Sequence, residues 1–342
     1  MNKVKNRKVA FCTLGCKVNQ YETNAMIQEF KKCEYNIVEF DEIADVYIVN
    51  TCTVTNMADR KSRQMLRKVK ELNAEAILVA VGCYAQVAKE ELEKIPEIDL
   101  ILGTNEKKNI VSYVEKMLDE NHSNVINVEL DKSKNTKIQA SNNNSKSNEK
   151  ENNHMSIEKQ SSITDVMHCE EYVDFGDVTF TEKTRAVIKV QDGCDRFCSY
   201  CIIPFARGHI RSRKPESVVS EITKIVDEGI KEVVITGIHL ASYGRDLEAS
   251  VEPTKNNKAN QVESKTNTSK TKEFANDNAE RNKLNNGYRL IDLLEEINKI
   301  DGIKRIRLRV IRAYTYYRKF CRKTIKARKN MWSFSSITPK WM

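Results

Sequence analysis

The sequence predicts an α/β protein whose first part is a doubly wound parallel sheet. Three short apolar stretches carry this prediction, because each is followed by a loop and then by an amphipathic stretch of helical period. The apolar stretches lie at 9–13, 46–50 and 76–81. Strands that alternate with helices are typical of a parallel sheet covered on both faces. We therefore expect consecutive βαβ units in the N-terminal part of the chain.

Each of the three predicted strands leads into a loop that contains a cysteine. These cysteines are Cys16, Cys52 and Cys83, and the helices after them are predicted over 21–32, 56–70 and 86–94. The loops that follow the strands of a doubly wound sheet open on one edge, which is where such sheets bind ligands. The three thiols can therefore converge and hold an iron–sulfur cluster. The alternative is that they are small buried hydrophobes, which suits Cys12 and Cys33 better.

A second cysteine group lies in the segment 193–201 with the spacing C-x3-C-x2-C. Its members are Cys194, Cys198 and Cys201. Three thiolates can bind three irons of a 4Fe–4S cluster and leave the fourth iron open, whereas clusters that only transfer electrons normally have four cysteines. A zinc ribbon half-site is the alternative, but a structural zinc site closes with four ligands and no second C-x2-C or histidine pair completes this one.

The spacing of this group, with the aromatic Tyr200 before its last cysteine, resembles that of radical S-adenosylmethionine (SAM) enzymes. Both cysteine groups together resemble the methylthiotransferase family. The segments that carry the resemblance are 13–23 (TLGCKVNQYET), 50–55 (NTCTVT), 82–86 (GCYAQ) and 201–208 (CIIPFARG). Their wording resembles the branch that converts N6-threonylcarbamoyladenosine beside the tRNA anticodon to its 2-methylthio form. The isopentenyladenosine and ribosomal-protein branches carry different residues around the first cysteine.

The resemblance implies two 4Fe–4S clusters and SAM as cofactors. It assigns Cys194, Cys198 and Cys201 to the SAM cluster, and Cys16, Cys52 and Cys83 to an auxiliary cluster that carries the inserted sulfur. It places Tyr200 near the adenine of SAM and Gly237, after the strand ending near Thr236, beside SAM. The implied partners are the anticodon stem-loop of tRNA and an electron donor such as flavodoxin or ferredoxin. No catalytic residue is assigned, since adenine C2 bears an unactivated hydrogen for which acid–base catalysis is of little use.

Composition bounds the class and the location of the protein. The 342 residues suffice for about two domains with substantial cores. No signal peptide is recognised at the N-terminus and no apolar run approaches a membrane span, so we expect a cytoplasmic protein without membrane contact. Ten cysteines in a cytosolic chain favour metal binding over disulfides.

Two polar stretches divide the chain into domains. Their residues are mostly Asn, Lys, Ser, Glu and Thr, a composition too polar to repay the entropy of ordering. We predict a methylthiotransferase domain over 1–125, a disordered linker or insertion over 126–170, and a partial radical SAM (β/α) barrel over 171–308 that contains a disordered insertion at 250–287. The partial barrel is expected to have three parallel strands, ending near Asp192, Thr236 and Leu308, with the edge after the third left unpaired.

The net charge of +9 is concentrated at the C-terminal end of the chain. Residues 302–342 hold 13 Lys and Arg and no acid, so the rest has 44 basic residues against 48 acidic. This segment matches no family motif as written. When 309–342 is back-translated and read from the second base of the Arg309 codon, synonymous codons permit the family sequences Gly-Ser-Leu-Glu-Pro and His-Phe-His-Leu-Ser-Leu-Gln-Ser-Gly. We therefore expect 309–342 to be an out-of-frame basic tail produced by a frameshift after Leu308, with the family's C-terminal RNA-binding domain absent.

The sequence thus predicts a tRNA methylthiotransferase whose turnover is impaired by truncation. Two alternatives remain open at this point. One is a non-catalytic iron–sulfur or RNA-binding remnant, in which the basic tail binds nucleic acid and its aromatic residues stack on bases. The other is a methylthiotransferase that acts on ribosomal protein. Arg211 and Arg213, after the cluster loop, would contact phosphate or the SAM carboxylate, or lie on a solvated surface, and His239 is given a structural role.

Overall fold

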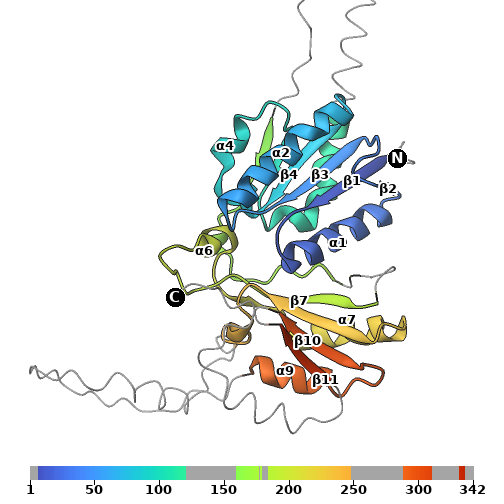
Figure 1. The fold of residues 1–342 in the computed structure, drawn as a ribbon, viewed down its shortest axis with the longest axis vertical. Coiled ribbons are helices and arrows are strands. Elements are labelled where there is room, and N and C mark those ends of the chain that lie inside the picture. The colour runs from blue at the N-terminus through green and yellow to red at the C-terminus, as the bar shows by residue number, and fades with distance from the viewer. Residues whose placement is uncertain are drawn as a thin grey trace, which may run out of the picture. The chain divides into compact units, whose positions relative to one another are not determined.

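The structure is a computed structural model that describes residues 7–120, 159–176, 178, 184–247, 288–309 and 331–335. Within these ranges the chain forms two compact units (Figure 1). The first unit comprises Met1–Cys169, Val173–Thr179 and Phe197–Arg207, and the second comprises Glu170–Tyr172, Phe180–Arg196 and Gly208–Met342. The predicted linker up to residue 158 and the predicted insertion at 250–287 lie outside the described residues.

The first unit is built on a six-stranded sheet in which every neighbouring pair of strands is parallel. Its order is β2-β1-β3-β4-β5-β6. The strands are β1 Lys8–Thr13, β2 Asn36–Val38, β3 Val46–Thr51, β4 Ile77–Gly82, β5 Leu100–Leu102 and β6 Gln160–Ser162. All residues of β3, β4 and β5 are buried. Burial of both faces explains why these strands read as continuous apolar runs.

Helices cover both faces of this sheet. They are α1 Lys17–Lys32, α2 Asn56–Leu72, α3 Cys83–Val87 and α4 Lys89–Glu93, with helical residues also at 110–120. Leu66 and Val69 of α2 pack in one apolar cluster with Tyr47 and Leu78, whereas Phe30 of α1 packs in another cluster on the opposite face. Alternate residues of each strand therefore point to different helices. The predicted doubly wound sheet is confirmed.

The second unit is a five-stranded sheet of order β11-β10-β9-β7-β8. Its strands are β7 Ala186–Asp192, β8 Arg211–Ser212, β9 Glu232–Gly237, β10 Arg305–Arg309 and β11 Met331–Ser335. Strand β8 runs antiparallel to β7, and the other pairs are parallel. Two helices connect the parallel strands: α7 Pro215–Asp227 lies between β8 and β9 in sequence, and α9 Leu290–Ile297 precedes β10. This arrangement agrees with the predicted partial (β/α) barrel.

The structure corrects the predicted number of parallel strands in the second unit. We expected three, with the edge after Leu308 unpaired, but β11 pairs with β10 over the full length of both strands. Backbone pairing does not require the apolar period on which the prediction was based, so the strand was missed. The predicted reading-frame change over 309–342 is not tested by this pairing and stays a prediction.

Two boundaries in the first unit also differ from expectation. The predicted linker 126–170 was wrong at its end, because β6 at Gln160–Ser162 continues the sheet beside β5 and is followed by a 3-10 turn at Val166–His168. The predicted helix over 86–94 is two short helices, since Ala88 leaves the helical region with φ −127° and ψ 42°. A three-residue polar edge strand offers no apolar period to detect.

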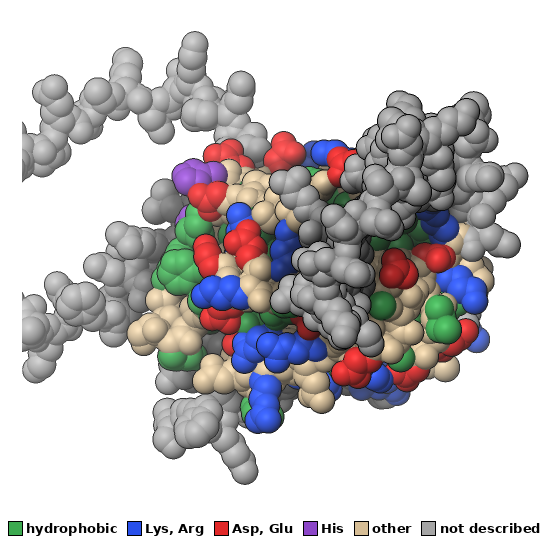
Figure 2. All heavy atoms as spheres, turned by 90° about the horizontal axis from the view of Figure 1, so that it is seen from above, with side chains coloured by type: hydrophobic (Ala, Val, Ile, Leu, Met, Phe, Trp, Pro, Cys, Tyr) green, Lys and Arg blue, Asp and Glu red, His purple; other side chains and the backbone are tan. Residues whose placement is uncertain are grey.

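Charges of both signs are mixed on one face of the described residues (Figure 2). None of the helices within the described ranges combines the length and the apolar character needed to cross a bilayer.

The loop between β1 and α1 depends on a glycine. Gly15 has φ +95°, and a Cβ added there would lie 2.5 Å from Cys52 Sγ. We expect Gly15→Ala to destabilise the first unit by more than the about 1–2 kcal/mol that a left-handed residue costs by itself, because the methyl group must also displace Cys52. Chemical denaturation followed by circular dichroism measures the loss.

Gly229→Ala is the matched control for this substitution. Gly229 has nearly the same backbone angle, φ +94°, but its added Cβ would meet nothing within 4 Å. It should therefore cost only the conformational term, about 1–2 kcal/mol, in the transition of the second unit. Equal losses for the two variants would contradict the proposed close approach of the Gly15 loop to Cys52.

Candidate metal centre

Cys16, Cys52 and Cys83 lie at the carboxyl ends of three neighbouring strands of the first unit. Cys16 is the residue before α1, Cys52 directly follows β3, and Cys83 is the first residue of α3. Their strands, β1, β3 and β4, are adjacent in the sheet. The predicted convergence at one edge is therefore the arrangement found. All three are free thiols.

The three thiols influence one another electrostatically. Desolvation raises the pKa of Cys16 above its ordinary value, although the residue as a whole is exposed, and the Arg207 guanidinium opposes this shift. Desolvation also raises the pKa of Cys52, with smaller contributions from Cys83 and Cys16. The thiols thus share one partly dehydrated space in which an extra positive charge favours their ionised form.

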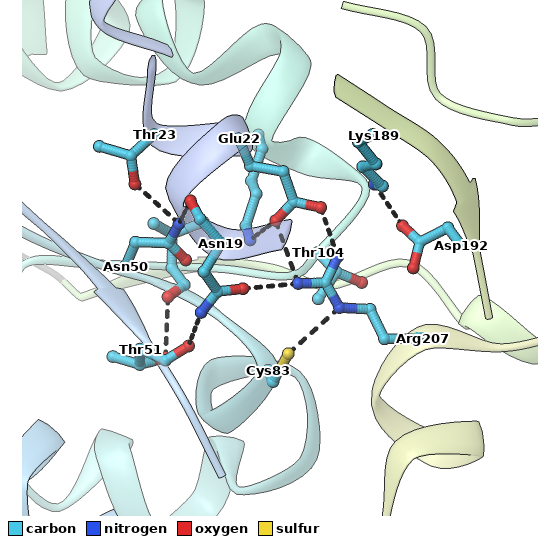
Figure 3. Close-up of polar contacts among 12 residues, drawn as sticks. Asn19, Glu22, Thr23, Asn50, Thr51, Cys83, Thr104, Lys189, Asp192 and Arg207 are labelled. Atoms are coloured by element: carbon cyan, nitrogen blue, oxygen red, sulfur yellow. Dashed lines mark hydrogen bonds and ion pairs between the residues drawn. The ribbon is translucent and has the colours of Figure 1, made fainter. Parts of the chain in front are cut away.

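That positive charge is the fully buried side chain of Arg207, at the end of α6 (Ile203–Arg207). Figure 3 shows its guanidinium pointing toward Glu22 and Asn19 of α1. Nη1 and Nη2 contact the two Glu22 carboxylate oxygens, the second at 3.0 Å, and Nη2 also donates to Asn19 Oδ1 at 2.6 Å. The remaining nitrogen, Nε, donates to Cys83 Sγ at 3.2 Å. Arg207 therefore joins α1 to the start of α3, directly after β4.

A second cation shares the same carboxylate. Lys107 Nζ contacts Glu22 Oε2, and both side chains are at most 1% exposed. Desolvation lowers the pKa of Lys107, and the Glu22 carboxylate opposes this shift. Two formal positive charges against one negative charge leave an excess of one positive charge beside the thiols. Such an excess suits a ligand set that carries several negative charges when it is ionised.

Asparagine and threonine side chains hold the same loops by hydrogen bonds to backbone. Asn19 Nδ2 donates to the carbonyl oxygens of Leu14 at 2.9 Å and Thr51 at 3.0 Å. Asn50 Nδ2 donates in turn to Asn19 O at 3.0 Å, and Thr51 Oγ1 donates to Val81 O at 2.8 Å. Each bond links a residue beside one cysteine to a neighbouring strand or loop. The cysteine positions are therefore set by tertiary contacts as well as by the sheet.

The donor set fits an iron–sulfur cluster better than a single metal ion. Among the described residues, no three His, Cys, Asp or Glu side chains are close enough to ligate one ion. A cluster takes one thiolate per iron, so its ligands lie farther apart than those of one ion. The absent side chain of Gly15 lets Cys52 Sγ pack directly against the loop that carries Cys16. Cys16, Cys52 and Cys83 would hold such a cluster.

The structure places the second cysteine group in two different units. Cys198 and Cys201 lie in the first unit, where Cys201 N donates to Cys198 O at 2.9 Å. Cys194 lies in the second unit, where its backbone N–H donates to Gly208 O at 3.0 Å. All three are thiols outside any disulfide, and all are partly exposed. Their joint role in a SAM cluster stays a prediction.

Tyr200 and Gly237 occupy contrasting environments. Tyr200 is 79% exposed and shares its segment with exposed Phe197 and Phe205, whose rings meet edge-to-face at 6.0 Å. Gly237 is buried at the end of β9, and an added Cβ would approach the Gln191 side chain to 3.0 Å. The small size of Gly237 therefore has a packing reason. Their predicted contacts with SAM stay predictions.

Three other residues considered from the sequence are buried in the second unit. Arg211 and Arg213 are each 1% exposed, which contradicts the alternative that they lie on a solvated surface. Arg213 pairs with the buried Glu221. His239 donates its backbone N–H to Gln191 Oε1 at 2.7 Å and contacts Ser242 Oγ through Nδ1, which agrees with a structural role.

The polar residues that surround the first cysteine group were not predicted from the sequence. They are Asn19, Glu22, Asn50, Lys107 and Arg207, all buried. One signal was available, since Asn19, Glu22 and Thr23 have the spacing of one helix face. A polar helix face usually lies toward solvent, so this spacing did not distinguish a buried polar network from an exposed surface. Nothing local indicated the contact of Arg207 with α1.

Glu22→Gln is expected to destabilise the first unit by about 3–5 kcal/mol, because it leaves the buried Arg207 and Lys107 without their carboxylate. The control is Glu29→Gln on the same helix, where Glu29 pairs at 2.7 Å with Lys32, an exposed side chain. That pair should contribute no more than about 1 kcal/mol. Denaturant unfolding of both variants measures the difference, and a loss for Glu22→Gln as small as that of the control would contradict the role assigned to this carboxylate.

Each half of the chain matches a different protein family. Residues 8–103 match the family described as "Uncharacterized protein family UPF0004", and residues 188–332 match the Radical SAM superfamily. The second match extends past Leu308 into the segment predicted to be out of frame. A solved structure of the radical SAM methyltransferase TsrM from Kitasatospora setae has a TM-score of 0.45 and 12% identity over 96% of this chain and 67% of that one.

Relatives of named activity match over most of this chain. The threonylcarbamoyladenosine tRNA methylthiotransferases of Bacillus subtilis and Aquifex aeolicus are 38% and 33% identical to it, over 70% and 88% of this chain and 45% and 55% of the relatives. A ribosomal protein uS12 methylthiotransferase of Desulfitobacterium hafniense is 31% identical over 89% of this chain and 52% of that protein. The chain thus spans about half the length of the curated relatives it matches. Over most of its length the chain is thus similar to radical SAM methylthiotransferases, and its two halves match the two family models separately.

Proposed function

We propose that the chain provides the catalytic part of a tRNA methylthiotransferase that converts N6-threonylcarbamoyladenosine to its 2-methylthio form. The observation that carries this proposal is the gathering of Cys16, Cys52 and Cys83 at one sheet edge, in a chain that also holds the C-x3-C-x2-C segment. Two separate cysteine groups suit a reaction that needs both a radical and a sulfur source. The names of the Bacillus and Aquifex relatives support this substrate.

The proposed cofactors are two 4Fe–4S clusters and SAM, which when bound would supply radical chemistry and sulfur. Cys16, Cys52 and Cys83 would hold one cluster, and Cys194, Cys198 and Cys201 the other. The other residues of the site would hold the cysteine-bearing segments in place and exclude water. Arg207 and Glu22 hold the start of α3 against α1, and Asn19 holds the loops after β1 and β3. A dry, fixed site protects a reactive intermediate from side reactions.

The proposed partners are the anticodon stem-loop of tRNA and a small electron donor such as flavodoxin or ferredoxin, in the cytoplasm. A second candidate substrate is ribosomal protein, which is favoured by the match to the Desulfitobacterium relative. The residues around Cys16 resemble the threonylcarbamoyladenosine branch more closely, so tRNA is the preferred substrate. A non-catalytic iron–sulfur or RNA-binding protein is the remaining alternative.

Product analysis tests the proposed reaction. The full chain, reconstituted anaerobically with iron and sulfide and used in excess, is incubated with SAM, a reductant and tRNA that carries threonylcarbamoyladenosine. Mass spectrometry of the nucleosides should show the 2-methylthio product, and Cys83→Ala and Cys198→Ala should each abolish it. Cys33→Ala is the control that should retain it, because Cys33 lies at the far end of α1. Methylthiolation of ribosomal protein uS12 alone would assign the other substrate, and no product from either would refute both.

Helix α2 offers a surface for the tRNA backbone. It contains six basic and two acidic residues and begins four residues after Cys52. Arg60 and Lys61 are exposed near its start. Phosphate contacts make binding depend on salt, by about one unit of log-log slope per contact. We expect Arg60→Glu with Lys61→Glu to weaken tRNA binding and to lower that slope by about two.

The matched control reverses two charges at the other end of the unit. Lys31 and Lys32 are exposed in the last turn of α1, which ends away from the cysteine edge. Lys31→Glu with Lys32→Glu has the same effect on net charge. Because these residues lie away from the cysteine edge, the double variant should change the slope much less. Filter binding at several salt concentrations measures both variants. Equal effects would indicate that only overall charge matters and would contradict a specific role for α2.

A further inference from the structure

The contact between Arg207 and Cys83 places a cation on a predicted cluster ligand. Arg207 is fully buried, and its Nε donates to Cys83 Sγ at 3.2 Å. The other two nitrogens of the guanidinium are held by Glu22 and Asn19 (Figure 3). Because the guanidinium is planar and held at its other nitrogens, its Nε–H is fixed in direction toward the sulfur.

The backbone next to Arg207 is also held in place. Ala206 O, the carbonyl before Arg207, accepts from Thr104 Oγ1 at 3.2 Å, and Thr104 N donates to Gln86 Oε1 at 2.9 Å. Gln86 belongs to α3, the helix that Cys83 begins. Arg207 and Cys83 are therefore linked twice, through the side chain and through Thr104. Movement of one relative to the other would break both links.

The electrostatic consequence concerns a cluster that gains an electron. Reduction adds one negative charge to the cluster, so nearby positive charge and hydrogen bonds to its sulfurs favour the reduced state. Burial strengthens both effects, since little water is present to screen them. Arg207 supplies both at once, whereas Lys107 acts on Cys83 by its charge and donates its hydrogen bond to Glu22.

We propose that Arg207 sets the reduction potential of the cluster held by Cys16, Cys52 and Cys83, through its N–H···S hydrogen bond to Cys83 and its buried charge. The inference rests on the cofactor set of the proposed function and assigns Arg207 a positioning and tuning role, not a catalytic one. The segment 197–207 also carries Cys198 and Cys201. The potential of one cluster would therefore depend on the docking of a segment that carries two ligands of the other.

The test measures potential and does not require turnover. The full chain carrying Cys194→Ala, Cys198→Ala and Cys201→Ala is reconstituted with iron and sulfide, so that any signal comes from the first cysteine group. Its midpoint potential is then determined by an electron paramagnetic resonance titration, with iron counted per chain. We expect Arg207→Gln to disfavour reduction by about tenfold, a shift of about −59 mV for one electron.

Two control variants separate the hydrogen bond from the charge. Lys107→Met removes the same formal charge as Arg207→Gln but leaves the contact between Nε and Cys83, so its shift should be clearly smaller. Glu22→Gln combined with Arg207→Gln keeps the formal charge of the wild type without the hydrogen bond. Its potential should lie below that of the wild type and above that of Arg207→Gln alone.

Each outcome decides the proposal. Equal shifts for Arg207→Gln and Lys107→Met would overturn the hydrogen bond as the cause, and an unchanged potential with full iron content would overturn the tuning role. If both Arg207 variants bind no iron while Lys107→Met binds it, Arg207 is a folding residue and the proposal is refuted. A parent chain that takes up no iron refutes instead the cofactor set of the proposed function, so the two failures are distinguishable.

Discussion

The buried ion pair between Arg207 and Glu22 is the interaction on which the cysteine edge depends. It connects residues 185 positions apart in sequence, and both side chains are at most 1% exposed. A buried charge is tolerated only when its partners satisfy it, so Arg207, Glu22 and Lys107 must be placed together. The pair thereby fixes α1, α6 and the start of α3 in one arrangement. An apolar contact of the same size would tolerate several arrangements, since apolar packing is not directional.

The neighbouring hydrogen bonds extend this constraint to the other two loops. Asn19 contacts Arg207 with its oxygen and the carbonyls of Leu14 and Thr51 with its nitrogen. One side chain therefore bridges the loops that carry Cys16 and Cys52 and the cation that contacts Cys83. A site for a cluster needs thiols held at fixed separations before the metal arrives, and a buried polar network provides this rigidity. The sheet alone fixes the strands but leaves the loops after them free to vary.

Much of the fold could be predicted because it follows from local patterns. Apolar runs followed by amphipathic stretches indicate βαβ units, and parallel strands joined by short connections place their following loops on one edge. The failures have equally physical reasons. Strand β6 is the polar tripeptide Gln160–Ser162, and β11 follows a segment without apolar period; both are held by backbone pairing with a neighbour. Backbone hydrogen bonds do not depend on the side chains that a sequence displays.

The sequence by itself determined the cysteine pattern and the parallel sheet, because spacing and hydrophobic order are local properties of the chain. Only the tertiary structure decided what surrounds the thiols. Arg207 contacts Cys83 across 124 positions of sequence, and nothing near either residue indicates the other. Likewise, the sequence around Glu22 is that of an ordinary exposed helical acid, and only the packing of α1 brings it against Lys107 and Arg207. Burial turns these polar side chains into a structural and electrostatic element, and burial is a property of the folded chain alone.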